Sequence, residues 1–189
     1  MKSASIPMLC TSLLQRIVQC IYNMPLPDEI HEYDDKTLKL VSYLVTNHPK
    51  PSVTVLMKLC YFVDLVATKR LKEKITKFNY IRYNYGPFDK DIYRYLEKAT
   101  RDKQVKEEQG FASESANDFI VLSSGENYST DTSFLSVEEL ACVENVITEV
   151  GNYGAGALTD IAYKTAPMKK IGAVRGGDQG MYEKLDLNV

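Results

Sequence analysis

Tryptophan is absent from the sequence and histidine is scarce, with only His31 and His48. A tetrahedral zinc site needs four closely spaced soft ligands, and the composition argues against one. Scattered thiols that serve as small apolar fillers are typical of a reducing compartment, so we expect a cytoplasmic protein without a bound metal. The four cysteines are scattered in this way, with no C-x-x-C pair: Cys10, Cys20, Cys60 and Cys142.

The motifs of common catalytic sites are also missing. The sequence contains no G-x-S-x-G elbow, no H-E-x-x-H pair and no P-loop that ends in Gly-Lys-Ser/Thr. The glycines between Gly151 and Gly156 follow a helical pattern, which indicates a helix C-cap and turn instead of a phosphate cradle. Both histidines are expected on the surface, one in a linker and one at a helix end. We therefore predict that the protein is not an enzyme and needs no cofactor.

Long apolar runs are lacking as well, and no stretch reaches the roughly 18 apolar residues of a membrane span. The run from Ile6 to Leu14 is followed by Gln15 and Arg16, with no small-residue cleavage site after it. We interpret residues 8–24 as an amphipathic helix and not as a signal peptide. This helix either packs on the core or presents its apolar stripe to a partner.

Charge is nearly balanced overall but unevenly spread. The net charge of −2 argues against a non-specific nucleic-acid binder, which usually has a basic face. Residues 61–110 contain twelve Lys/Arg and eight Asp/Glu, whereas residues 111–160 contain nine Asp/Glu and no Lys or Arg. The acidic block either complements a basic partner or forms a solvated face.

Periodic apolar residues predict a series of amphipathic helices after the N-terminal one. In the longest pattern, Leu56, Leu59, Cys60 and Val63 recur on one face. The expected helix boundaries, in chain order, are caps at Asp34 or Asp35, at Ser52, at Asp89 and at Ser136 with Glu139, a stop at Gly151, and the end of a last helix before Pro167.

Two segments break the helical period and are rich in residues that favour strands. An aromatic stretch from Lys74 to Tyr85 is expected to be extended and to end at a Gly86-Pro87 turn. Residues 118–122 form a second candidate strand, which could pair with the aromatic one, and residues 100–117 are interpreted as a polar loop. The predicted fold is mainly α (α+β), a compact bundle of about six helices with a small antiparallel β element.

The predicted organisation has three parts. Residues 1–30 form an N-terminal helix and linker, and residues 31–172 form the domain. Residues 173–189 are expected to be a flexible C-terminal tail, because the stretch before Met181 is rich in glycine.

The aromatic stretch is the most informative part of the sequence. Six of the thirteen tyrosines fall between Tyr61 and Tyr95. Tyrosine offers a large rigid contact area with a polar tip and is enriched at interface hot spots, although the same rings can simply cover a core. Gly86 precedes Pro87, so its backbone is pushed from the right-handed helical region, and we expect a conformational requirement at this glycine between the extended segment and the next helix. The predicted partner-binding residues are Tyr80, Arg82, Tyr83, Tyr85, Gly86, Pro87 and Phe88.

Four motifs in order resemble one known family. The run Leu56-Met57-Lys58-Leu59-Cys60-Tyr61-Phe62-Val63-Asp64 resembles a helix of the form L-x-K-L-L-Y-F-A-D, and Tyr85-Gly86-Pro87-Phe88 resembles a Y-G-P-V turn. Leu135-Ser136-x-x-Glu139 resembles an L-S-x-x-E helix start, and residues 158–168 resemble an L-x-x-x-T-H-x-x-x-P-W segment. The chain is thereby identified as a member of the SocA-like antitoxin (Panacea) family, also called phage-associated GepA-like proteins. Ala162, Tyr163 and Met168 depart from the last motif, which puts in doubt any role of the usual His and Trp.

The resemblance implies a mainly helical antitoxin that neutralises a cognate protein toxin by direct contact. Members pair with unrelated toxins, so the identity of the toxin does not transfer. In one branch the antitoxin acts as a proteolytic adaptor for a cytosolic AAA+ protease, which makes such a protease a second candidate partner. Some members carry an added DNA-binding domain, and residues 1–35 are too short to be one.

Another function remains open at this stage. A nucleic-acid-binding or phage-related regulatory protein without catalysis is the alternative, since Lys77 and Arg82 are interleaved with aromatic rings. The net acidic chain argues against that alternative. We expect no membrane partner, and the sequence leaves open whether the chain forms homo-oligomers.

Overall fold

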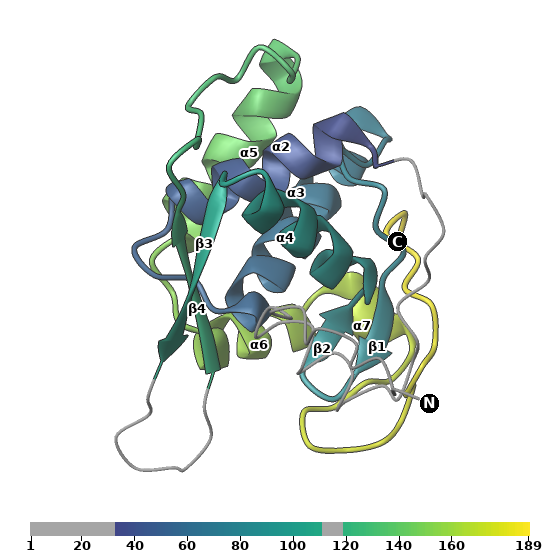
Figure 1. The fold of residues 1–189 in the computed structure, drawn as a ribbon. Coiled ribbons are helices and arrows are strands. Elements are labelled where there is room, and N and C mark those ends of the chain that lie inside the picture. Colours follow the sequence, from purple (N-terminus) through teal and green to yellow (C-terminus); the bar gives the residue numbers. More distant parts are fainter. Residues whose placement is uncertain (1–32, 111–118) are drawn as a thin grey trace, which may run out of the picture.

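The computed structural model describes residues 33–110 and 119–189 of the chain (Figure 1). The amphipathic helix predicted at residues 8–24, and the linker after it, lie outside the described residues. The described part contains the predicted mixture of several helices and small antiparallel β elements, which confirms the mainly α (α+β) fold class. None of its helices is long and apolar enough to cross a membrane.

The helices confirm most of the predicted boundaries. Asp34 and Ser52 are N-caps whose side chains accept backbone N–H groups of the first turn, and Ser136 and Glu139 form the expected capping box. The helices are α2 (Asp35–Thr46), α3 (Val53–Leu71), α4 (Asp91–Arg101), α5 (Val137–Val150), α6 (Ala155–Tyr163) and α7 (Ala166–Lys170).

Two details differ from the prediction. The N-cap of α4 is Lys90 and not Asp89 as predicted. Asp89 lies one residue before the cap, and its carboxylate accepts a hydrogen bond from the Asp91 N–H. The helix α6 is not the last one, because α7 follows it and includes Pro167 in its first turn. A proline is tolerated there, since the N–H that it lacks has no intrahelical partner.

Helix α3 forms the centre of the domain, with other helices packed around it (Figure 1). Every residue from Val55 to Asp64 is buried, including the polar Lys58 and Asp64. A helix that is apolar on nearly all sides is expected to lie inside a protein, which explains this central position.

The β elements are two separate hairpins. Strand β1 (Ile81–Tyr83) pairs antiparallel with β2 (Gly86–Phe88), so the turn lies at Asn84-Tyr85 and not at Gly86-Pro87 as predicted. Strand β4 (Phe119–Ser124) pairs with β3 (Val105–Gly110), and the suggested pairing of residues 118–122 with the aromatic stretch is wrong. The prediction of a loop over residues 100–117 missed β3 because Val105 is followed there by the polar run Lys106-Glu107-Glu108-Gln109.

The segment predicted to be a flexible tail packs on the domain. It runs antiparallel to β1, where the Arg82 N–H donates to the Glu183 carbonyl at 2.9 Å and the Leu185 N–H donates to the Tyr80 carbonyl at 2.9 Å. Leu185 and Leu187 are buried. Burial of these leucines, together with the backbone pairing, offsets the conformational freedom of the glycines before them.

Candidate functional site

An open groove with a volume of about 890 Å³ brings together several of the sequence-predicted site residues. It lies between the N-terminal part of α3, the β1–β2 hairpin and the starts of α4 and α6. Its lining is mostly apolar and aromatic, with a few basic groups, and is typical of a binding site in that respect. Residues from each wall include Val55, Met57 and Lys58 of α3, Tyr83, Tyr85, Gly86 and Phe88 of the hairpin, Ile92 and Tyr93 of α4, and Ala155 and Thr159 of α6.

The floor of the groove contains a lysine without an acidic partner. Lys58 is 2% exposed, and its Nζ donates to the Pro87 carbonyl at 2.8 Å. Among the described residues it has no ion-pair partner, and burial lowers the pKa of its ammonium to about 7. The bond to Pro87 ties the middle of α3 to the second strand of the hairpin.

The hairpin places three of the predicted aromatic residues at the groove. Tyr85, in the turn, is 68% exposed, whereas Tyr83 and Phe88 are half-buried. The rings of Tyr83 and Phe88 lie 5.2 Å apart between centroids, and Phe88 lies 6.2 Å from Tyr93 of α4. These contacts form one aromatic wall, made of Tyr83, Phe88 and Tyr93, and Tyr85 lies in the turn beside it.

Two other predicted site residues do not reach the surface. Tyr80 is buried under α3, and its hydroxyl donates to Asp64. Arg82 is 1% exposed, with its guanidinium bonded to the carbonyls of Val174 and Gly177 and placed 5.7 Å from the centre of the Tyr163 ring. Side chains alternate along a strand, so Arg82 points opposite to Tyr83, into the C-terminal segment.

Gly86 and Pro87 have structural positions at the edge of the groove. Gly86 has a φ of 92°, in the region that favours glycine, and a Cβ built there would lie 3.5 Å from the Tyr163 ring and 3.7 Å from the Lys58 Cε. Pro87 is buried and contributes its carbonyl to Lys58. Both residues shape the hairpin over the lysine and offer little surface to a partner.

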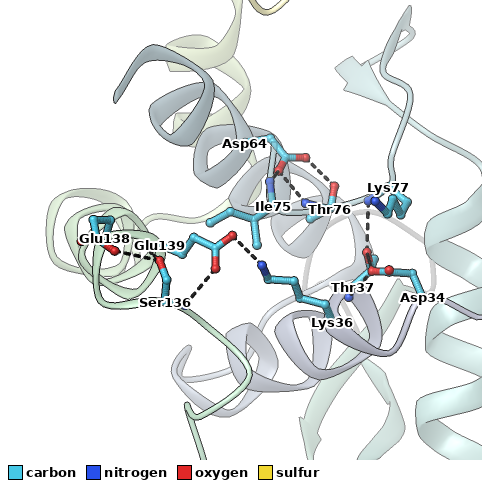
Figure 2. Close-up of polar contacts among 10 residues, drawn as sticks. All are labelled: Asp34, Lys36, Thr37, Asp64, Ile75, Thr76, Lys77, Ser136, Glu138 and Glu139. Carbon is cyan, nitrogen blue, oxygen red and sulfur yellow. Dashed lines mark hydrogen bonds and ion pairs between the residues drawn. The ribbon is translucent and has the colours of Figure 1, made fainter. Parts of the chain in front are cut away.

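A buried carboxylate holds the segment that leads into the hairpin. The oxygens of Asp64 accept the backbone N–H groups of Ile75 and Thr76 at 2.9 and 2.8 Å, together with the Thr76 hydroxyl (Figure 2). Burial raises the pKa of Asp64, while these donors act in the opposite direction. At the next residue of this segment, the Lys77 N–H donates to the Thr37 Oγ1 at 3.0 Å (Figure 2), and this bond anchors the segment to α2 as well.

Figure 2 also shows how α5 is joined to α2. The Lys36 ammonium lies 2.5 Å from the Glu139 carboxylate, which belongs to the capping box of α5. The acidic start of α5 therefore already has a cationic partner within the domain. Glu138, next to it, accepts from the Ser136 hydroxyl at 3.0 Å.

Other groups offer no reactive or metal-binding arrangement within the described ranges 33–110 and 119–189. No cluster there has three His, Cys, Asp or Glu side chains that could hold a metal ion. Cys60 and Cys142 are free and buried, and burial raises the pKa of both thiols. A thiol with a raised pKa is a poor nucleophile at neutral pH.

Sequence reasoning missed the importance of Lys58 and Asp64 as buried polar groups. Both lie in the α3 motif that carries the resemblance, outside the stripe of Leu56, Leu59, Cys60 and Val63, and helical periodicity would leave Lys58 on the opposite, solvent-facing side, yet both are buried. A charged residue inside an otherwise apolar helix is a usable signal, because such a group is rarely buried without a specific partner.

Comparison with known protein families identifies the family of the domain that contains this groove. The family model of the antitoxin SocA-like, Panacea domain matches residues 56–167. The chain belongs to the SocA-like antitoxin family. No curated protein and no solved structure matches the chain.

The family match covers much of the groove lining, although Lys50, Val55 and Arg175 lie outside it. It includes most of α3 with Lys58 and Asp64, the β1–β2 hairpin, and α6. Tyr163, where the family pattern has a histidine, packs against Gly86 and under Arg82. Met168, in place of the usual tryptophan, is fully buried. In this chain both side chains are therefore buried, and Tyr163 packs behind the hairpin.

Proposed function

We propose that this chain neutralises a cognate protein toxin by direct contact, through the groove and the aromatic hairpin beside it. One observation carries the proposal. In an antitoxin-family domain, the exposed Tyr85 and the packed rings of Tyr83 and Phe88 line one open groove with a mostly apolar lining. Aromatic residues held rigidly at the edge of a hollow are the composition expected of an interface hot spot.

The proposed contact residues are Tyr83, Tyr85 and Phe88. Tyr80 and Arg82 are buried in the structure and support the hairpin from behind. We place the protein in the cytoplasm, because the buried free thiols Cys60 and Cys142 suit a reducing compartment.

Co-expression with the toxin encoded beside this gene tests the function. The toxin alone should arrest growth, and co-expression of this chain should restore it. The half-life of the toxin, measured with and without this chain, separates simple occlusion from delivery to an AAA+ protease. Growth arrest that persists when both proteins are soluble would contradict the proposal.

A substitution at the hairpin tests the surface. Tyr85→Ala should weaken toxin binding by about 2 kcal/mol or more, measured by calorimetry or surface plasmon resonance. It should change the free energy of unfolding by only about 0.5 kcal/mol, because Tyr85 is mostly exposed. Tyr128→Ala is the matched control, since Tyr128 is also exposed but does not line the groove. Equal binding by the two variants would remove the hairpin from the interface.

A further inference from the structure

The charged residues that line the groove all have the same sign. They are Lys50 at the rim, Lys58 at the floor and Arg175 at the far side, and no Asp or Glu is among the described lining residues. Arg175 is already paired with Asp160. Lys58 is therefore the buried cation of the groove that has no neutralising partner, and it uses one of its three N–H donors on Pro87.

The surroundings of Lys58 supply no negative charge at neutral pH. The titratable groups that face the groove are His48 before α3, Tyr83 and Tyr85 of the hairpin, and Tyr93 of α4. Burial raises the pKa of the Tyr93 phenol and lowers that of the His48 imidazole, so both are neutral at pH 7 to 8. A buried ammonium is costly without a counter-charge, which is why its pKa is lowered to about 7.

The groove walls above Lys58 favour the binding of apolar side chains. Val55, Met57, Phe88, Ile92 and Ile120 all line the groove. A volume of about 890 Å³ can hold several side chains of a peptide segment. A charged group at the floor of an apolar hollow gives specificity, because a partner without the complementary charge would leave the lysine unpaired.

We propose that the groove accepts an apolar segment of the protein partner that carries one inward-pointing Asp or Glu side chain, whose carboxylate pairs with the Lys58 ammonium. This inference rests on the proposed function and names the chemistry that the partner presents to this site. Pairing would fill the unused donors of Lys58 and stabilise its charged form, so the complex would take up a proton as it forms.

A single-stranded nucleic acid is a less suitable occupant, although basic and aromatic groups are both present. A nucleic-acid groove needs several cations along the backbone path. Here Lys58 is buried below the hairpin and Arg175 is engaged with Asp160, which leaves Lys50 as the rim cation. One buried cation among apolar side chains suits a single carboxylate better than a row of phosphates.

Selection of peptides from a phage-displayed random library against the full chain tests the inference without any toxin. We expect the selected peptides to share one Asp or Glu flanked by apolar residues. In a synthetic peptide of that consensus, replacing the acid by its amide should weaken binding at least about tenfold. Lys58→Met in the protein should abolish this preference, whereas Lys50→Met, the matched control at the rim, should retain it.

Calorimetry in buffers of different ionisation enthalpy gives a second readout. At pH 8 the complex with the acidic peptide should take up close to one proton as it forms with the unsubstituted protein, and the complex with the amide peptide should take up none.

Four outcomes would each overturn the inference. They are equal affinity for the acid and amide peptides, selection of peptides without an acid, failure to select any peptide, and salt-dependent binding of an oligothymidine that displaces the peptide. A peptide that binds through Lys58 without competing with the toxin would instead contradict the proposed toxin surface, so the two failures are distinguishable.

Discussion

The hydroxyl of Tyr80 donates to the carboxylate of Asp64 at 2.8 Å, and both groups are buried. This bond joins the central helix α3 to the residue just before the β1–β2 hairpin. Together with the bonds to Ile75 and Thr76, it makes Asp64 a binding point for a backbone segment that has no regular secondary structure. The position of the aromatic wall thus depends on one carboxylate in the core.

Asp64→Ala should lower the free energy of unfolding by about 3 kcal/mol or more. The substitution leaves two buried backbone N–H groups and two hydroxyls without their acceptor, and each unsatisfied group costs about 1–3 kcal/mol. Urea denaturation measures the loss. Glu126→Ala is the control, because Glu126 only forms a surface ion pair with Lys103 and its loss should cost less than about 1 kcal/mol. Similar values for both variants would show that the carboxylate does not hold the segment.

Gly86→Ala should destabilise the protein by about 1–2 kcal/mol. The cost comes from the positive φ of 92°, since the added Cβ would meet Tyr163 and Lys58 only at ordinary contact distances. Gly156→Ala is the matched control in the first turn of α6, where nothing lies within 4 Å of the new Cβ. That control should be neutral or slightly stabilising. An unchanged melting temperature for Gly86→Ala would remove the conformational requirement.

The free energy of unfolding should rise by about 2 kcal/mol between pH 7 and pH 9. In this range the unfolded chain keeps Lys58 protonated, with a pKa of 10.5, whereas the folded protein, with a pKa of about 7, releases that proton. The unfolded state therefore binds more protons, and stability increases with pH. Two sets of groups act in the opposite direction: the thiols of Cys60 and Cys142, whose pKa values burial raises, as the pH approaches 9, and the phenols of Tyr43 and Tyr61, with pKa values of about 12, above about pH 9.

Lys58→Met isolates this contribution. The variant should lose the rise in stability between pH 7 and pH 9 in urea denaturation series, because no other described group of the groove floor titrates there. Lys50→Met, with an exposed lysine, should keep the pH profile of the unsubstituted protein. An unaltered profile in Lys58→Met would mean that the ammonium is better solvated than its burial implies.

Leu185→Ala should cost about 2–3 kcal/mol, as expected for a buried leucine that leaves a cavity. The side chain belongs to the C-terminal segment that pairs with β1 and covers Arg82. Val189→Ala, at an exposed position of the same segment, should have almost no effect. If Leu185→Ala were equally silent in thermal unfolding, the packing of this segment would contribute little to stability.

The helices were predictable because their signals are local. Asp34, Ser52 and the pair Ser136 and Glu139 each satisfy N–H groups within three residues, so the sequence alone determines where α2, α3 and α5 begin. A conformational requirement at Gly86 was also predictable, since a glycine before a proline is pushed from the helical region, whereas its positive φ of 92° was established only by the structure.

Strand partners and buried polar groups were decided only by the tertiary structure. Strand β3 has few apolar residues, and its partner β4 follows only after the intervening residues 111–118. No local sequence pattern therefore predicted that β3 pairs with β4. The same holds for the pairing of residues 182–185 with β1, which connects positions about a hundred residues apart. Sequence placed Arg82 beside exposed rings, whereas the C-terminal segment buries it.

The groove shows most clearly which features the sequence determined and which only the tertiary structure determined. The sequence determined that aromatic residues gather near Gly86 and that Lys58 belongs to the central helix. Only the fold determined that Lys58 lies beneath Gly86, bonded to Pro87 and with no carboxylate among the described residues that line the groove, because those neighbours come from separate elements packed together. Local hydrogen bonds and periodicity act within a few residues, whereas burial and charge pairing depend on which distant side chains the packed core brings into contact.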